Sequence, residues 1–359
     1  MSTPSHESPP EQARKVVVHR AGGYGRLTLE THPVPPIGDG EVRVRTEAVG
    51  VNFADCIVRM GLYASAREYV GWPITPGFDF AGVVDAVGEG VVGVEVGDEV
   101  FGVTRFGGYA THVVVPSTQL FPRPSELTVE QAAAFPTIYI TAWYALHHLG
   151  AVEPGADVLV HSAAGGVGGA LVQLAKGAGA RVVGVVGGAH KVETALAHGA
   201  DVVIDRSSQD LWAAADRAAP HGYRIIADAN GVATLKDSYR RLAPQGRLVV
   251  YGFHTMFRRN GPGWTNPFSL ALGWLRTPRF NPLDMTSSNK SVLAFNLSFL
   301  FPRQDILASA MAELLQAARD GVITPPPIQT FALHEVAEAH RALETGTTVG
   351  KLVLLTASS

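Results

Sequence analysis

The stretch VLVHSAAGGVGGALVQLAKGAGARVVGVV, which runs from Val158 to Val186, decides the fold. Its pattern is that of a strand, a glycine-rich turn, a helix and a second strand. A glycine-rich turn alone is weak evidence, but a position between a strand and a helix is the setting that dinucleotide-binding motifs require. The stretch therefore predicts one βαβ unit of a Rossmann domain, and a tight structural turn without a ligand is the less favoured alternative.

The turn follows the GxGxxG design, with Ala163 in place of the first glycine. We expect Gly165 to let the backbone approach a pyrophosphate and Gly168 to let the helix pack closely on the strand. The free N–H groups at the start of the helix would face the anion. The residues predicted to bind the nucleotide here are Ala164, Gly165, Gly166, Val167 and Gly168.

The end of the second strand distinguishes NADPH from NADH. NAD sites usually place Asp or Glu there, about 20 residues beyond the glycines, to hold the ribose hydroxyls. This chain has no carboxylate at that point but has Gly187 and Lys191, and Arg206 follows the third strand. A carboxylate would repel a 2′-phosphate, whereas these cations would attract it. We therefore predict NADPH, with solvated surface roles for Lys191 and Arg206 as the alternative.

Strands and helices alternate from about residue 157 to residue 251, which is typical of a parallel sheet with helices on both faces. The expected strands are 158–161, 181–186, 201–204, 224–228 and 247–251, and the expected helices include 168–178 and 191–198. In the first third of the chain, short Val-rich strands alternate with Gly and Pro turns. That pattern predicts a small barrel or sandwich. A helical connection is expected over 129–149, with a break at Pro136.

Residues 253–290 break this alternation and mix aromatic residues, arginines, prolines and glycines. We interpret them as an inserted lid or an interface loop, in which Phe257, Trp264 and Trp274 would cover an apolar substrate or an oligomer contact. Further on we expect a strand over 291–301, an amphipathic helix over 303–320, a helix at about 334–345 and a final strand over 351–355. The helix over 303–320 carries Leu307, Met311, Leu314 and Leu315 on one stripe.

Composition excludes several classes of protein. The 359 residues are 46% apolar with a net charge of −3, which argues against a mainly disordered chain and gives no support for a nucleic-acid or anionic-membrane partner. The single Cys56 excludes an intrachain disulfide and any zinc site with several thiolates. The Ser- and Pro-rich start lacks the features of a signal peptide, and no apolar run is long enough to span a bilayer. We expect a disordered tail over 1–12, no stable membrane insertion and a cytoplasmic location.

Three stretches resemble the zinc-independent quinone oxidoreductase branch of the medium-chain dehydrogenase/reductase superfamily. They are GVNFADCIVRMGLY (50–63), the stretch 76–100 that begins PGFDFAGVV, and HSAAGGVG (161–168). AHRALETGTTVGKLVL (339–354) also matches, and MTSSNKSVLAFNLSFLF (285–301) is more similar to the VAT-1 homologues within that branch. The resemblance covers nearly the whole chain beyond the tail.

The resemblance implies an α/β architecture of two domains. A GroES-like β-barrel catalytic domain would comprise 13–137 and 321–359. A Rossmann domain with a doubly wound parallel sheet would comprise 138–320, with the insert at about 253–290. The active site would lie between them. The strand near 293–300 resembles the edge strand through which relatives dimerise, so a homodimer is implied.

The chain departs from the zinc alcohol dehydrogenases of the same superfamily. Asn52 stands where those enzymes have a cysteine ligand, and Phe78-Asp79 stands where they have a His-Glu pair. Neither Asn nor Phe replaces those ligands, and Cys56 lies four residues beyond the ligand position. We therefore expect no metal.

The resemblance implies hydride transfer from NADPH to a quinone or another small, apolar conjugated carbonyl, with the chemistry supplied by the cofactor. Asn52 and Tyr63 would line the substrate side, and the nicotinamide would be held by Thr141, Tyr251, Gly252 and backbone atoms near Phe295. Asn52 is alternatively a helix cap, and Tyr63 a packing residue. Two other functions stay open. One is an enoyl reductase of an acyl thioester or natural-product intermediate, with Tyr63 as proton donor. The other is an NADPH-bound, VAT-1-like interaction protein with little or no reductase activity.

Overall fold

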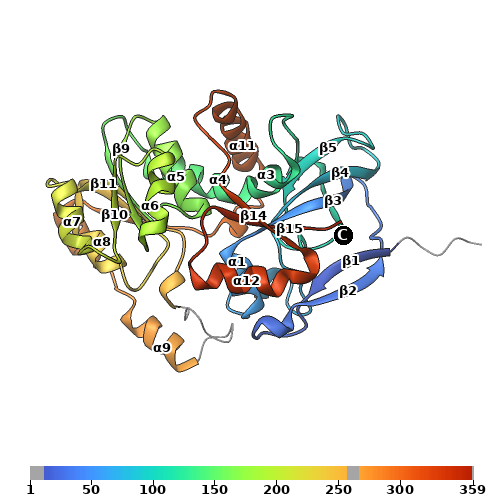
Figure 1. Cartoon of the computed structure of the whole chain (residues 1–359), viewed down its shortest axis with the longest axis horizontal. Helices are drawn as coiled ribbons and strands as arrows, with labels where there is room; N and C mark the ends of the chain where they lie inside the picture. The colour runs from blue at the N-terminus through green and yellow to red at the C-terminus, as the bar shows by residue number, and fades with distance from the viewer. Residues whose placement is uncertain (1–11, 257–266, 358–359) are drawn as a thin grey trace, which may run out of the picture. The chain divides into compact units, whose positions relative to one another are not determined.

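A computed structural model describes residues 12–256 and 267–357 (Figure 1). The chain forms two compact units. The N-terminal unit comprises Met1–Ala133, Thr330–Glu338 and Val353–Ser359, and the central unit comprises Ala134–Gln329 and Ala339–Leu352. The predicted tail over 1–12 lies outside the described residues except for Gln12, which already belongs to the first strand.

The N-terminal unit is mainly antiparallel β structure, with β14 and β15 belonging to it only in part. The described residues form a seven-stranded sheet of β3 (Glu41–Val51), β4 (Asp79–Val87), β5 (Glu99–Val103), β6 (His112–Pro116), β7 (Leu120–Pro122), β14 (Ile328–Ala332) and β15 (Lys351–Leu355). A separate hairpin joins β1 (Gln12–Val17) to β2 (Thr28–Pro33). The valines of β3 and β4 that alternate inward are buried, as expected for a sheet with one face on a core. The predicted barrel-like first domain is confirmed.

The central unit contains a six-stranded parallel sheet in the order β10-β9-β8-β11-β12-β13. Its strands are β8 (Asp157–His161), β9 (Arg181–Val186), β10 (Val202–Asp205), β11 (Tyr223–Asp228), β12 (Leu242–Val250) and β13 (Ser291–Ala294). The chain runs outward from β8 to β10 and then returns to β11 on the other side of β8. Sheets of this kind bind ligands beyond the carboxyl ends of their strands, at the point where the order reverses. The predicted Rossmann sheet is confirmed.

Helices cover both faces of this sheet (Figure 1). The four helices are α5 (Gly166–Gly177), α6 (Val192–Ala197), α7 (Leu211–Ala218) and α8 (Leu235–Arg240). Along β9, Gly184 faces Ala195 of α6, whereas Val183 and Val185 pack in a core cluster with Ala214 of α7. Alternate residues of one strand point to opposite faces, so α6 and α7 lie on opposite sides and the sheet is doubly wound.

Further helices follow the sequence expectations closely. The connection over 129–149 is α3 (Val129–Ala134), α4 (Pro136–Trp143) and a π-helical stretch, Tyr144–Gly150, with the break before Pro136 as predicted. On α11 (Gln304–Arg319) the predicted stripe is buried at Leu307, Met311 and Leu314, and Leu315 is half-buried. The last helix is α12 (Val336–Thr345). None of the helices in the described ranges has the length and apolar character that crossing a bilayer requires.

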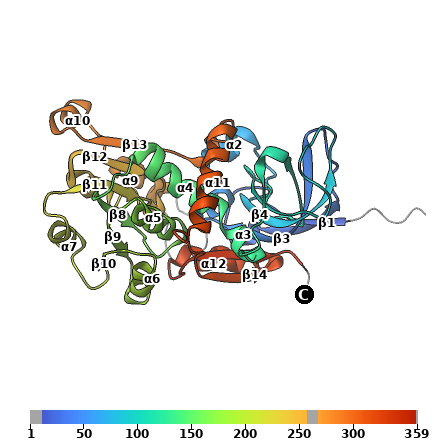
Figure 2. The same cartoon turned by 90° about the horizontal axis from the view of Figure 1, so that it is seen from above.

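The strand predicted over 291–301 is wrong in its length. β13 lies beside β12 (Figure 2), with which it pairs, but it ends at Ala294. Leu297–Phe299 form a 3-10 turn. The reason is local: the Asn296 side chain accepts a hydrogen bond from the backbone N–H of Ser298, 3.0 Å away, and this competes with strand pairing. The described part of the insert is helical, with α9 (Pro267–Arg276) and α10 (Pro282–Ser288). Trp274 lies on α9 and is 66% exposed, whereas Phe257 and Trp264 lie outside the described residues.

Candidate functional site

Most of the predicted cofactor residues lie directly after strands of the parallel sheet. Residues 164–168 follow β8, Gly187 follows β9, and Arg206 follows β10. Tyr251 and Gly252 follow β12, and Phe295 follows β13. Since parallel strands end at one edge of a sheet, these positions share the carboxyl edge. Thr141 and Lys191 are the exceptions, because Thr141 is buried on α4, which packs against α5, and Lys191 is the N-cap of α6.

The glycine turn contains one glycine that the fold needs and one that it does not. A Cβ on Gly168 would lie 2.0 Å from the carbonyl oxygen of Ser162, so no side chain fits there. A Cβ on Gly165 would meet only that same oxygen, at 3.4 Å, which is an ordinary contact. Gly165 is the N-cap of α5 with φ −87° and ψ 172°, a conformation that any residue adopts. The open space at Gly165 therefore adjoins the positive end of a helix.

Three basic residues occur near Gly187. Arg206 is close to it in space, and His190 and Lys191 follow it in the chain. A Cβ on Gly187 would lie 3.8 Å from both Nε and Nη2 of Arg206. Lys191 Nζ donates to the carbonyl oxygen of Gly346 at 2.7 Å, and His190 Nε2 lies 3.2 Å from the carbonyl oxygen of Thr347. Sequence reasoning named Lys191 and Arg206 but missed His190, although it directly precedes Lys191.

A carboxylate does lie on the neighbouring strand, at Asp205. Its Oδ1 accepts from the hydroxyl and the backbone N–H of Ser207, at 2.7 and 2.9 Å. These hydrogen bonds lower the pKa of Asp205, so it stays ionised near neutral pH. Asp205 is therefore engaged by its own turn, whereas the guanidinium of the half-buried Arg206 lies 3.8 Å from a Cβ on Gly187.

The positions predicted to hold the nicotinamide are tied to the strand ends by backbone hydrogen bonds. Tyr251 N–H donates to the carbonyl oxygen of Asp228 at 3.1 Å, and Phe295 N–H donates to that of Val250 at 3.2 Å. A Cβ on Gly252 would lie 3.0 Å from the carbonyl oxygen of Ala229, so two loops are in close contact there. Desolvation raises the pKa of Tyr251, and the charge of Asp228 adds to this, so the phenol is neutral.

A buried polar cluster at the same edge was missed by sequence reasoning. Asp228 ends β11, His161 ends β8, and both are fully buried. His161 Nε2 lies 3.2 Å from the hydroxyl oxygen of Ser238, which in turn lies 3.0 Å from Oδ2 of Asp228. Desolvation lowers the pKa of His161. A single sequence does not show that two positions so far apart in the chain come into contact. The only indication in the sequence was that each of two apolar strands ends in a polar residue.

In the N-terminal unit, Asn52 is built into a buried hydrogen-bond network. It is the N-cap of α1 (Phe53–Arg59), and its Nδ2 donates to Oδ2 of Asp79 at 2.8 Å. Asp55 Oδ2 accepts from the N–H of Asn52 at 2.8 Å and from the Tyr109 hydroxyl at 2.9 Å, while its Oδ1 accepts from Gly77 N–H at 2.9 Å. These contacts support the helix-cap interpretation of Asn52, and its role in a substrate pocket stays a prediction.

Tyr63 is half-buried at the N-cap of α2 (Ala64–Tyr69). Its ring is edge-on to Phe78 and Phe106, with centroids 5.9 and 6.3 Å away. The packing interpretation has these contacts in its favour. A role as proton donor stays a prediction.

The side chains around Asn52 do not fit a zinc ion. Zinc binds sulfur, imidazole nitrogen or carboxylate oxygen, and the position of the first ligand holds an amide whose nitrogen is committed to Asp79. Phe78, at the second position, offers only a ring that packs 5.3 Å from the ring of Phe106. The carboxylate of Asp55 is engaged by three donors. The donor set therefore agrees with the expectation of no metal.

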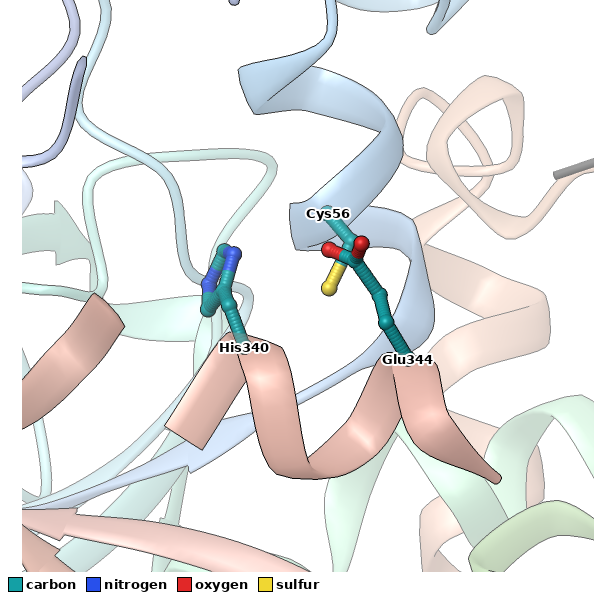
Figure 3. Close-up of side chains that lie close together, drawn as sticks. All are labelled: Cys56, His340 and Glu344. Carbon is teal, nitrogen blue, oxygen red and sulfur yellow. The ribbon is translucent and has the colours of Figure 1, made fainter. Parts of the chain in front are cut away.

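Figure 3 shows His340 and Glu344 one helical turn apart on the same side of α12, both buried. Cys56, labelled in the same picture, is buried on α1 of the N-terminal unit. Each of the three side chains takes part in an interaction, and we assign no metal to them.

Comparison with known proteins gives matches over most of the chain. Residues 38–125 match the alcohol dehydrogenase GroES-like domain, and residues 198–354 match the zinc-binding dehydrogenase family. The human synaptic vesicle membrane protein VAT-1 homolog is 35% identical over 344 residues, which cover 95% of this chain and 86% of that protein. The Escherichia coli quinone oxidoreductase solved with NADPH superposes with a TM-score of 0.82 at 27% identity, covering 96% of this chain and 100% of that one. The CurK enoyl reductase gives 0.82 at 26% identity, covering 96% and 99%.

Proposed function

Because the chain belongs to the medium-chain dehydrogenase/reductase family, in the branch of the quinone oxidoreductases and VAT-1 homologues, we propose that it is an NADPH-dependent reductase of quinones or other conjugated carbonyls. One observation carries the proposal. At the carboxyl edge of the parallel sheet, a Cβ on Gly165 would meet a single atom, at 3.4 Å, and a Cβ on Gly187 would lie 3.8 Å from the Arg206 guanidinium, which supports a pyrophosphate and a 2′-phosphate at these two positions. A reductase of this family needs both features.

Two groups of residues would hold the cofactor. The free N–H groups at the start of α5 would receive the pyrophosphate, because Gly165 leaves the approach open. Arg206 and Lys191 would receive the 2′-phosphate, since no carboxylate ends β9. The relative solved with NADPH supports this choice of cofactor. When bound, NADPH would supply the hydride.

The remaining residues of the site would orient the nicotinamide. Tyr251 and Gly252 would form one wall, Phe295 would offer its backbone to the carboxamide, and Thr141 would stand beside the ring. An electron-poor acceptor needs no Lewis acid, which is consistent with a donor set around Asn52 that does not fit zinc. Protons would come from solvent.

The test is NADPH oxidation by the purified chain across quinones, enones and enoyl thioesters, with NADH as the comparison. We expect turnover with quinones or enones and a clear preference for NADPH. Tight NADPH binding without oxidation by any acceptor would instead support the interaction-protein function. Absence of binding to either nucleotide would contradict the proposal as a whole.

The likeness to the CurK enoyl reductase supports enoyl reduction as a second candidate. Tyr63→Phe separates the two, because phenylalanine keeps the ring against Phe78 and Phe106 and removes only the hydroxyl. An enoyl reductase that uses this acid should slow by about 10²–10⁴-fold. Quinone reduction should change little.

We also propose that the protein is a homodimer that pairs through β13. This strand is the last in the described sheet and has β12 as its neighbour on one side. Light scattering should give twice the mass of the chain, and a monomer would contradict this proposal.

A further inference from the structure

The buried cluster that contains Asp228 connects two strand ends and a helix. Asp228 Oδ1 accepts from the backbone N–H groups of Asn230 and Gly231, at 2.8 and 3.0 Å. Its Oδ2 accepts from the hydroxyls of Thr234 and Ser238, at 2.7 and 3.0 Å. One carboxylate thus fixes the loop after β11 and the first turns of α8.

The geometry also assigns the proton on His161. The Ser238 hydroxyl has a single proton and donates it to Asp228. Its oxygen can therefore only accept from His161 Nε2, 3.2 Å away, so the neutral ring carries its hydrogen on Nε2. The chain of donors runs from His161 through Ser238 to Asp228. His161 is the residue immediately before the turn that begins at Ser162.

The loop after β11 in turn supports the loop after β12. The carbonyl oxygen of Asn230 accepts from the N–H and the hydroxyl of Thr255, at 2.9 and 2.6 Å. The carbonyl oxygen of Ala229 accepts from His254 N–H at 2.9 Å, and that of Asp228 accepts from Tyr251 N–H at 3.1 Å. The loop 251–255 is therefore held on residues 228–230.

We propose that Asp228, with Ser238 and His161, is a positioning residue for the cofactor. It holds Tyr251 and Gly252 in register with the glycine turn through its contacts with the two loops and with Ser238. The inference rests on the proposed function, because it assigns the spacing of the two loops to one buried carboxylate. A fully buried carboxylate with four donors is rigid, since any displacement leaves a charge or a donor unpaired in a medium of low dielectric.

The test compares Ser238→Ala and Asp228→Asn with Tyr223→Phe. Tyr223 lies on the same strand, five residues before Asp228, and its buried hydroxyl donates to the carbonyl oxygen of Ala215 at 2.8 Å. Tyr223→Phe therefore also removes a buried hydrogen bond, but at the opposite end of the strand. It provides a control for stability loss alone.

Fluorescence titration with NADPH and thermal unfolding are measured for all four proteins. We expect Ser238→Ala and Asp228→Asn to raise the Kd at least tenfold and to speed hydrogen exchange at residues 230–231 and 251–255. Tyr223→Phe should lower the Tm by a similar amount and leave the Kd within twofold.

If Ser238→Ala and Asp228→Asn lower the Tm but bind NADPH as the wild type does, the cluster is only structural and the inference is overturned. If Asp228→Asn fails to fold, the Kd of Ser238→Ala alone decides between a positioning role and a purely structural role for the cluster. The titration of the wild type in the same series distinguishes a failure of the proposed function from a failure of the positioning role of Asp228. If the wild type does not bind NADPH, the proposed function fails. If the wild type binds and the Kd values of the variants are unchanged, only the positioning role fails.

Discussion

Gly165→Ala should weaken NADPH binding while leaving the free protein intact. The new methyl group would lie 3.4 Å from the carbonyl oxygen of Ser162, and the backbone of Gly165 already has a conformation that alanine adopts. In the free protein, the lower entropy of the unfolded alanine chain stabilises by about 0.4–1 kcal/mol. The loss of a good N-cap residue offsets much of this, so the net change in unfolding free energy should be small.

The bound state is different, because the methyl group occupies space that a pyrophosphate would need. Forcing an extra methyl group into a well-packed contact costs about 1–3 kcal/mol. That corresponds to about a 5- to 150-fold rise in the Kd for NADPH. The assay is fluorescence titration with NADPH, together with thermal unfolding of the same preparation.

Gly168→Ala is the matched control, since the two glycines lie in the same turn. Its Cβ would lie 2.0 Å from a backbone oxygen, so the turn itself must move. We expect a markedly lower Tm or no folded protein. The reasoning is refuted if Gly165→Ala binds NADPH as the wild type does, or if its Tm falls as far as that of Gly168→Ala.

The other predictions concern selectivity, stability and pH. Gly187→Asp would place a carboxylate beside Arg206, because a Cβ on Gly187 lies 3.8 Å from the guanidinium. The Kd for NADPH should then rise at least tenfold more than the Kd for NADH. Equal changes of the two Kd values in parallel titrations would contradict the assignment of the 2′-phosphate. Lys191→Glu should act in the same direction in the same titrations. Tyr109→Phe removes a donor to the buried Asp55 and should lower the unfolding free energy by about 1–3 kcal/mol in urea, whereas an unchanged midpoint would show that Asp55 does not depend on this bond. Desolvation lowers the pKa of His161 and of His198 in the folded protein, so the unfolded chain takes up protons first as the pH falls below about 6.5. In urea titrations, the unfolding free energy should therefore be highest above about pH 6.5 and should decrease as the pH is lowered from there to 5; a free energy that stays constant or increases on acidification would contradict this sign.

The parts of the fold that could be predicted are those that neighbouring residues determine. The glycine turn, the break before Pro136 and the final strand each depend on a few adjacent side chains, and each is where the sequence indicated. The strand expected over 291–301 was too long, because the Asn296 side chain captures a backbone N–H that a strand would use. Val-rich alternation predicts a strand but does not show which local hydrogen bond will end it.

The residues of the candidate site also fall into those that local sequence could indicate and those that it could not. Most of the predicted cofactor residues lie together because they follow strands, and parallel strands end at one edge of the sheet. His161 and Asp228 were not, since they are 67 residues apart in the chain and meet only after β8 and β11 pair. Asn52 shows a third case. The sequence offered a substrate-pocket role or a helix cap for Asn52; the structure shows the cap and an amide that donates to Asp79, a contact that the sequence did not indicate.

Gly350 links the glycine turn to the end of the chain. Its φ is +71°, a Cβ on it would lie 2.0 Å from the carbonyl oxygen of Pro327, and its N–H donates to the carbonyl oxygen of Ala164 at 3.0 Å. The carbonyl oxygen of Ala164 is therefore synthesised before its hydrogen-bond donor, the N–H of Gly350, which lies 186 residues later in the chain. Until then Ala164 has to find another donor, such as water. The glycine turn should consequently be completed only after residues 327–350 have emerged, rather than when the βαβ unit first emerges.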